Sequence, residues 1–87
     1  MGRLEFMQKP IKVSEHAKRR MAKYGLSRDV VVEALREPDQ VLTGYRERKI
    51  AHKFKNSYVL RVVYTEEDVL TVITIYPARR ERYAKKI

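Results

Sequence analysis

Three side chains in this sequence are of types that can handle a phosphate group or a proton: His16, Arg61 and Thr74. His16 follows Ser14, a residue type that caps helices, so we expect His16 in the first turn of a helix, where anions are favoured. There it could act as a general acid or base near neutral pH, or contact a phosphate. The alternative is an ordinary surface residue beside the cap.

Arg61 interrupts the apolar run YVLRVVY. It either faces outward at the edge of a sheet or presents its planar guanidinium to a phosphate. Thr74 lies in a β-branched run and could be an ordinary strand residue. The remaining candidates are tyrosines, which we expect mainly to pack, although any that is exposed among arginines could stack on a base. These are Tyr58, Tyr64, Tyr76 and Tyr83.

Several classes of site are excluded by composition. The chain has no cysteine, which removes disulfides, thiolate metal sites and cysteine nucleophiles. It has two histidines without a carboxylate cluster, and no glycine-rich loop, so we expect no metal ion and no cofactor. No apolar run reaches the roughly 18 residues needed to cross a bilayer. We therefore expect a cytoplasmic protein without a membrane partner.

Charge is the strongest signal in the composition. Twenty Lys and Arg against eleven Asp and Glu give a net charge of +9. The excess lies in residues 8–24 (+5), 45–61 (+5) and 77–87 (+4), whereas residues 25–44 and 62–76 are net acidic. We expect the three basic segments to form one continuous surface that binds a polyanion. The alternative is that the basic residues only keep the protein in solution.

The chain is long enough for one domain of 87 residues. Helices are expected at 15–24, between the cap Ser14 and Gly25, and from Ser27 to the residue before Pro38. The period then changes to that of strands, which adds to a short N-terminal strand at 11–13. Strands are expected at 40–43, 48–55, 58–64 and 69–76, with Pro77 ending the last. This order predicts an α+β fold in which the helices pack on one face of a three- to four-stranded antiparallel sheet. Residues 1–10 and 84–87 are expected to be flexible.

The turns predict which residues pair. A two-residue turn at Asn56-Ser57 pairs residue 54 with 59 and 52 with 61, and a loop centred on residues 66–67 pairs 61 with 72 and 59 with 74. Paired side chains share a face. The expected open face carries His52, Arg61, Thr74 and Tyr76 among Ile50, Val59, Val63 and Val72. The face expected to meet the helices carries Leu60, Val62, Ile73 and Ile75 with Lys49 and Lys53. A one-residue slip in either loop would exchange the two faces.

The sequence also resembles a known family. The segment IKVSEHAKRRMAKYGLSRDVVVEALREPDQV resembles the opening of a family of small prokaryotic proteins of unassigned function related to RelE- and ParE-type toxins. The matching features are His16-Ala17, Arg20-Met21, Gly25-Leu26-Ser27 and Glu37-Pro38, followed by LRVVY, VITIY and the ending Arg79, Arg82 and Tyr83. The resemblance runs from Ile11 to Tyr83 and is more specific for the fold than for an activity.

This resemblance implies a RelE/barnase-like fold and a metal-independent endoribonuclease of the toxin type. In such enzymes the ribose 2′-hydroxyl attacks the adjacent phosphate. The implied roles are acid or base for His16, transition-state stabilisation for Arg61, and positioning of the phosphate or shared proton transfer for Thr74 and Tyr83. The expected partner is RNA, ribosome-associated RNA included. The basic residues expected to hold its backbone are Arg20, Arg48, Lys53, Arg79 and Arg82.

The alternative is a non-catalytic module that binds nucleic acid, or an acidic antitoxin-like protein, through the same basic surface. Some relatives inhibit gyrase or have no known activity, so the fold alone does not decide the chemistry. A cluster of His16, Arg61 and Thr74 or Tyr83 in an open cleft would favour the enzyme. His16 in solvent, away from Arg61, would favour the module. The target RNA and the oligomeric state stay open.

Overall fold

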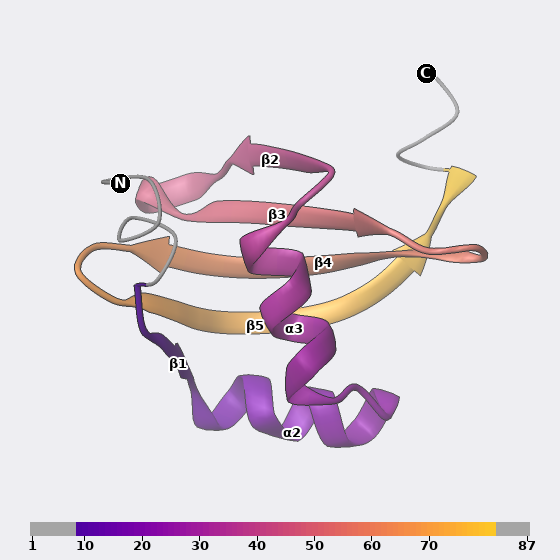
Figure 1. Cartoon of the computed structure of the whole chain (residues 1–87), viewed down its shortest axis with the longest axis horizontal. Helices are drawn as coiled ribbons and strands as arrows, with labels where there is room; N and C mark the ends of the chain where they lie inside the picture. The colour runs from indigo at the N-terminus through magenta and orange to yellow at the C-terminus, as the bar shows by residue number, and fades with distance from the viewer. Residues whose placement is uncertain (1–8, 82–87) are drawn as a thin grey trace.

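The computed structural model describes residues 9–81. The chain forms a short strand, two helices and then a run of strands, which confirms the predicted α+β fold (Figure 1). The elements are β1 (Ile11–Val13), α2 (Glu15–Tyr24), α3 (Arg28–Arg36), β2 (Gln40–Thr43), the 3-10 turn η1 (Tyr45–Glu47), β3 (Lys49–Phe54), β4 (Tyr58–Glu66) and β5 (Leu70–Arg79). No helix within residues 9–81 is long and apolar enough to cross a membrane.

The strands form a single five-stranded sheet in the order β1-β5-β4-β3-β2. Strands β2 to β5 are antiparallel, as the short turns between them predicted. The sheet is larger than the three to four antiparallel strands expected, because β1 joins it as a parallel edge strand beside β5. The crossover from β1 to β5 contains both helices, and a parallel pair requires a connection of this kind.

Both helices begin and end as their sequences predict. The hydroxyl oxygens of Ser14 and Ser27 accept from the backbone N–H groups of Ala17 and Val30, at 3.1 and 3.4 Å. Gly25 adopts the left-handed conformation (φ 66°), which lets the N–H of Leu26 donate to the carbonyl of Met21 at 2.8 Å and close the end of α2. These caps depend on neighbours in sequence alone.

The strand register was predicted correctly on one side of β4 and incorrectly on the other. Phe54 pairs with Val59 and His52 with Arg61, as expected. Arg61, however, pairs with Tyr76 rather than with residue 72. Strand β4 continues to Glu66, so the turn lies further along the chain than expected and the register shifts by three residues. A β-bulge after Val63 shifts the register by one residue more. The total shift is even, so His52, Arg61, Thr74 and Tyr76 still share a face.

The bulge has a partner at the start of α2. Ile73 is the extra residue, since Val63 pairs with Thr74 and Tyr64 with Val72. The Ser14 hydroxyl donates to the Ile73 carbonyl at 3.0 Å, and the Ser14 N–H donates to the Val72 carbonyl at 3.1 Å. Because of the bulge, Val72 lies on the helix side of the sheet, where it is fully buried. The prediction that Val72 lies on the face of Arg61 was therefore wrong.

Pro77 does not end the last strand, contrary to the prediction. It lies inside β5 and pairs with Leu60. Strand β1 pairs with β5 only from Leu70 to Val72, so β5 is an edge strand at Pro77. An edge strand tolerates proline because the missing N–H would have pointed outward.

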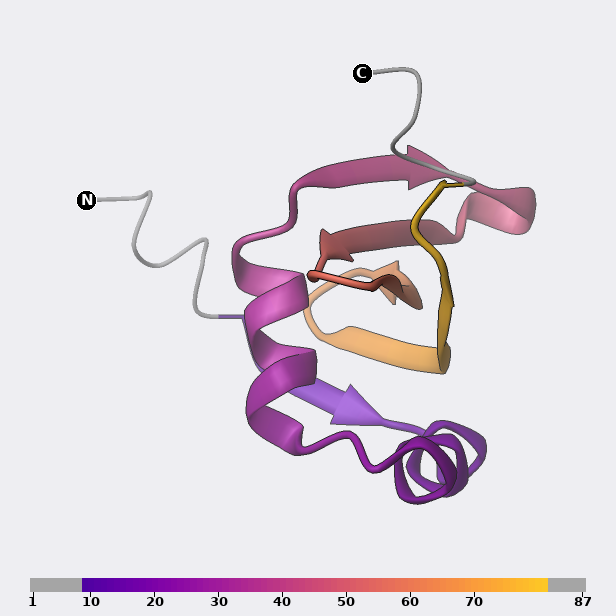
Figure 2. The same ribbon diagram turned by 90° about the vertical axis from the view of Figure 1, so that its right-hand side faces the viewer.

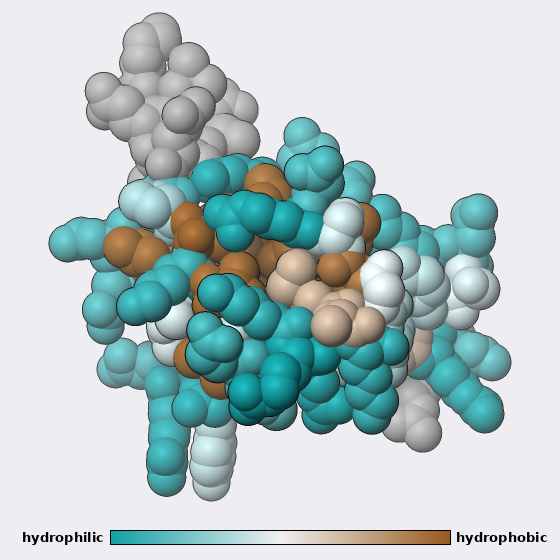
Figure 3. Space-filling view, turned by 90° about the horizontal axis from the view of Figure 1, so that it is seen from below, coloured by the Kyte–Doolittle hydropathy of each residue, from teal (hydrophilic) through white to brown (hydrophobic). Residues whose placement is uncertain are grey.

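The core lies between the sheet and the helices. Its fully buried members come from α2, α3, β3, β4 and β5 and include Ala17, Val31, Ala51, Leu60 and Ile75. Figure 2 shows α3 across one side of the curled sheet and the end of β5 rising on the other side. Figure 3, the view onto α2 from below, shows hydrophilic side chains around an apolar area.

Glu66 ties the start of the described chain to the middle of the sheet. Its carboxylate accepts from Lys9 at 3.1 Å and from Lys49 at 2.8 Å. Lys9 thus has a partner although it falls in the segment expected to be flexible, and Pro10 accepts from the N–H of Leu70. The rest of the two segments expected to be flexible lies almost entirely outside the described residues.

We expect Glu66→Gln to lower the free energy of unfolding by about 1 kcal/mol at neutral pH. Hydrogen bonds from Lys49 and Lys9 hold the pKa of Glu66 below the ordinary glutamate value of 4.5. Its contribution is therefore complete above pH 4.5 and is lost as the pH falls through the lower, folded-state pKa. The free energies of unfolding of the parent and the variant, measured with urea at a series of pH values, should become equal in acid. Glu67→Gln, at the exposed neighbouring position, is the control. If Glu66→Gln is still less stable than the parent at about pH 2, the stabilising role of the Glu66 carboxylate is wrong.

Candidate nucleic-acid interface

One row of polar side chains crosses the sheet on the face turned away from the helices. Gln40 pairs with His52, His52 with Arg61, and Arg61 with Tyr76, so the row has one member on each strand from β2 to β5. The neighbouring residues of β3 and β4, Ala51 and Leu60, belong to the core on the helix side. Alternation along each strand therefore places the row on the opposite face.

The row is connected by hydrogen bonds. Arg61 Nε lies 3.0 Å from His52 Nε2, and Arg61 Nη1 lies 2.6 Å from the Tyr76 hydroxyl. His52 Nδ1 lies 3.1 Å from Gln40 Oε1. A guanidinium can only donate, so His52 Nε2 must be the acceptor, and its Nδ1–H donates to Gln40. These contacts define one tautomer of a neutral imidazole.

His52 supports Arg61 and is not placed to take a proton from a ligand. It is fully buried, and burial, together with the positive charge of Arg61, lowers its pKa below 6.5. The imidazole is therefore uncharged at neutral pH, which suits an acceptor for the guanidinium. Both of its nitrogens are already in contact with neighbours in the row.

Arg61 is the member of the row best suited to an anion. Its guanidinium is fixed on one side by His52 and on the other by Tyr76, and its central carbon lies 5.4 Å from the centre of the Tyr76 ring. His52 and Tyr76 are both uncharged groups, and their contacts orient the guanidinium. A planar, oriented guanidinium is the side chain that proteins favour for phosphate.

A second arginine stands over an aromatic ring at the end of β3. The Arg80 guanidinium lies 5.5 Å from the centre of the Phe54 ring and donates to the carbonyl of Lys55. Phe54 shares the face of His52, because the two residues are two positions apart on β3 and Ala51 points to the other face. The face thus combines two arginines with two aromatic rings, Phe54 and Tyr76.

The structure brings together some of the residues expected to act in catalysis. Thr74 pairs with Val63 and lies on the same face as Arg61, two residues along β5 from Tyr76. His16 is the second residue of α2 and is exposed, beside Ala17 of the core, and the row does not include it. Tyr83 lies outside residues 9–81.

The residues expected to hold a nucleic-acid backbone are spread over several elements. Arg20 on α2 lies over the ring of Tyr24, 6.0 Å from its centre, and Arg48 directly precedes β3. Arg79 is exposed at the end of β5, opposite Tyr58. Arg82 lies outside the described part of the chain.

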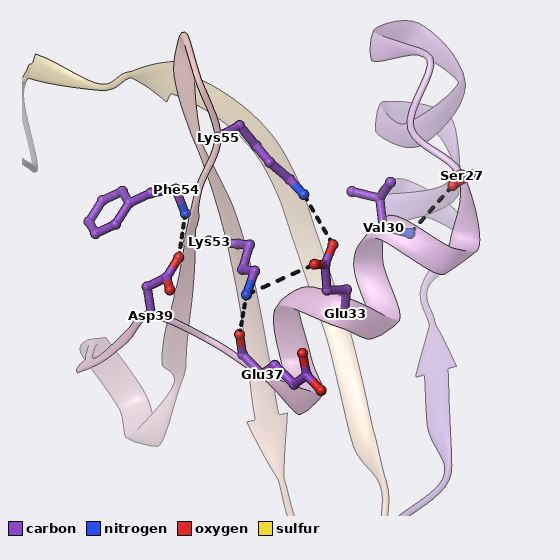
Figure 4. Close-up of polar contacts among 8 residues, drawn as sticks. All are labelled: Ser27, Val30, Glu33, Glu37, Asp39, Lys53, Phe54 and Lys55. Carbon is purple, nitrogen blue, oxygen red and sulfur yellow. Dashed lines mark hydrogen bonds and ion pairs between the residues drawn. The ribbon is translucent and has the colours of Figure 1, made fainter.

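Lys53 points toward the helices and not toward the row. Its ammonium donates to the carbonyl of Glu37 at 2.7 Å and lies 3.9 Å from the carboxylate of Glu33 (Figure 4). Lys55 pairs with the same carboxylate at 3.0 Å. These contacts fasten the end of α3 to β3, which is a structural role, and they leave Arg61 and Arg80 as the better placed cations on the face turned away from the helices.

Arg61 was selected from the sequence, but the other members of the row, His52, Tyr76 and Gln40, were not. The signal was available for two of them, since the expected register already placed His52 and Tyr76 on the face of Arg61. Gln40 had no such signal, because its pairing with His52 depends on the turn between β2 and β3. Within residues 9–81 there is no group of three or more His, Cys, Asp and Glu side chains that could hold a metal ion.

Comparison with known proteins identifies the family. The model of the domain of unknown function DUF4258 matches residues 13–77, which is most of the chain. Searches of the curated proteins and of the solved structures found no significant match. The match to DUF4258 contains no link to RelE- or ParE-type toxins or to the barnase-like superfamily. It covers both helices, strands β1 to β4 in part or whole, and the part of β5 that carries Tyr76, and on this match the chain belongs to the DUF4258 family.

Proposed function

We propose that this protein binds single-stranded RNA on the sheet face that carries Arg61. The observation that supports it most is the guanidinium of Arg61, oriented by the buried, neutral His52 and by Tyr76. An arginine that only keeps a protein in solution would need no such support. The net charge of +9 supports a polyanionic ligand.

Single-stranded RNA fits this face better than a duplex does. A sheet that carries aromatic rings beside cations can stack unpaired bases and hold the phosphates between them. Phe54 and Tyr76 each lie under an arginine on this face. The resemblance to RelE-type proteins, seen in the sequence, points to the same ligand.

We expect the affinity for a labelled single-stranded RNA to fall steeply with salt. Each phosphate contact should contribute about −0.7 to the slope of log K against log salt concentration. Fluorescence anisotropy over a range of salt concentrations measures the slope, and a DNA strand of the same sequence is the comparison. A slope near zero, or no binding at low salt, would refute the proposal.

Cleavage of the bound RNA is a second candidate function. The Tyr76 hydroxyl lies 2.6 Å from Arg61 Nη1, which places a proton donor beside a cation. In a metal-independent reaction the 2′-hydroxyl would lose its proton to a solvent water and attack the adjacent phosphate, which forms a 2′,3′-cyclic phosphate and breaks the bond to the 5′ oxygen. Arg61 would stabilise the charge that develops on the phosphate, and the phenol would protonate the leaving 5′ oxygen. Thr74 would contact the same phosphate, and Tyr83 and His16 are the further candidates from the sequence. The exposed position of His16 on α2, outside the row, favours binding without cleavage.

Labelled RNA incubated with the protein and EDTA distinguishes the two functions. Binding alone leaves the RNA intact. If products appear, Tyr76→Phe and His16→Ala identify the proton donor, because each removes one group that can give up a proton. Tyr76→Phe also removes a hydrogen-bond partner of Arg61, so RNA binding is measured on each variant to separate loss of the proton donor from loss of the oriented guanidinium. Loss of cleavage in His16→Ala with full activity in Tyr76→Phe would restore His16 as the acid or base.

A further inference from the structure

The turn between β2 and β3 is held in a conformation that its residues do not favour. Arg46 and Glu47 both have positive φ angles, 56° and 63°. Glycine and asparagine are the residues normally found there, since a Cβ atom makes this region costly. The turn is closed by hydrogen bonds from the N–H of Gly44 to the carbonyl of Arg48 at 2.6 Å, and from the N–H of Arg48 to the carbonyl of Tyr45 at 3.0 Å.

This turn exposes an aromatic side chain to solvent. Tyr45 is 87% exposed, compared with 47% for Val41 and 37% for Tyr24, the other exposed large hydrophobic residues within residues 9–81. An exposed ring of this size contributes little to the core. Arg46 follows it directly in the sequence, and Arg48 comes two residues later, after Glu47. Base-stacking sites on single-stranded nucleic acids combine an exposed ring with neighbouring cations in this way.

The turn adjoins the face that carries Arg61. A Cβ atom on Gly44 would lie 3.6 Å from the side chain of Ile50. Ile50 pairs with Val63 and, two residues before His52 on β3, shares the face of the row. Arg48 and His52 are four residues apart, or about 13 Å along an extended strand. A single strand of RNA lying along β3 from Arg61 would therefore reach the turn after a few nucleotides.

We propose that Tyr45 is a stacking platform for a base of the RNA strand whose phosphate binds at Arg61, with Arg46 and Arg48 holding the neighbouring phosphates. The inference rests on the proposed RNA binding and adds a second contact point. The RNA strand would then run along β3 between Arg61 and the turn. The strained backbone keeps the ring and both arginines in one short turn.

Tyr45→Ala tests this platform. The variant should bind a single-stranded RNA of about 10 nucleotides about fivefold to a hundredfold more weakly than the parent does, the range for loss of one base stack. The slope of log K against log salt should not change, because Tyr45 carries no charge. Tyr45→Phe keeps the ring and should bind like the parent. All variants should unfold at the parent's temperature, since the side chain is exposed.

A fluorescence measurement tests the stacking directly. The chain contains no tryptophan, so Tyr45→Trp introduces a single indole at the turn. Its fluorescence should be quenched by the RNA of about 10 nucleotides and not by a dinucleotide, which is too short to reach from Arg61 to the turn. If the parent binds RNA while Tyr45→Ala binds equally well and Tyr45→Trp is not quenched, the platform is wrong and the proposed function stands. If the parent binds no RNA, both are wrong.

Discussion

Arg61→Gln is expected to weaken the binding of single-stranded RNA by about tenfold to a hundredfold, the range for loss of a hydrogen bond to a charged group. The substitution removes the guanidinium that His52 and Tyr76 orient. The slope of log K against log salt should become less steep by about 0.7, which corresponds to one phosphate contact on a single strand. Anisotropy titrations of the two proteins measure both quantities.

The matched control is Lys12→Gln, which makes the same change in net charge. Lys12 is exposed on β1, which lies at the opposite edge of the sheet from β2. If only the overall charge matters, the two variants will weaken binding equally, and the proposed site is wrong. Arg61→Lys keeps the charge but loses the planar fork, and it should bind more weakly than the parent and more tightly than Arg61→Gln. Thermal unfolding of each variant separates a loss of binding from a loss of folding.

His52→Ala is expected to lower the free energy of unfolding by about 2–5 kcal/mol, the range for large-to-small substitutions at buried positions. His52 is fully buried. Its removal leaves a cavity and takes from Arg61 the acceptor that lies 3.0 Å from its Nε. Urea unfolding measures the change, and RNA binding should fall with it, since Arg61 loses its orientation.

His52 should also make the stability depend on pH in mild acid. Burial and the charge of Arg61 lower the pKa of His52 in the folded protein below the value of 6.5 for a solvated imidazole. Below pH 6.5 the unfolded chain takes up a proton that the folded protein does not. The free energy of unfolding therefore decreases as the pH is lowered from 6.5 to the folded-state pKa of His52. The slope in this interval approaches 1.4 kcal/mol per pH unit, roughly, for one group.

His52→Gln isolates this effect, because it keeps a polar side chain of similar length and removes the titration. The variant's stability should change little between about pH 6.5 and about pH 5, whereas that of the parent should decline. His16→Gln, on the surface of α2, should behave like the parent. Equal pH profiles for the parent and His52→Gln would show that His52 is not held neutral in the folded protein.

The helices could be predicted from the sequence because their signals are local. Ser14 and Gly25 delimit α2, and Ser27 and Pro38 delimit α3, each through contacts within a few residues. The pairing of β3 with β4 could be predicted for the same reason, since Asn56-Ser57 forms a tight turn. The pairing of β4 with β5 could not, because it depends on contacts of Lys9 and Lys49 with Glu66, and on the bulge at Ile73, which Ser14 supports from the other end of the chain.

The candidate site was predictable in part. Arg61 stood out because a charged residue in an apolar strand needs a partner, and the expected face already contained His52 and Tyr76. The structure adds that His52 is that partner, as a buried acceptor, which its strand position alone could not show. Tyr45 had no signal in the sequence, because its exposure follows from the backbone angles of the turn that carries it.

The contact between Ser14 and Ile73 spans 59 residues, and the pair Lys9 and Glu66 spans 57. By contrast, β2, β3, β4 and β5 follow one another in sequence and pair with their neighbours. Contacts between close residues form faster, because less chain entropy is lost when they close. During synthesis, therefore, β1 and α2 leave the ribosome first but have no place to dock until β5 has been made. We therefore expect the meander of β2 to β5 to form first and the N-terminal segment to complete the domain last.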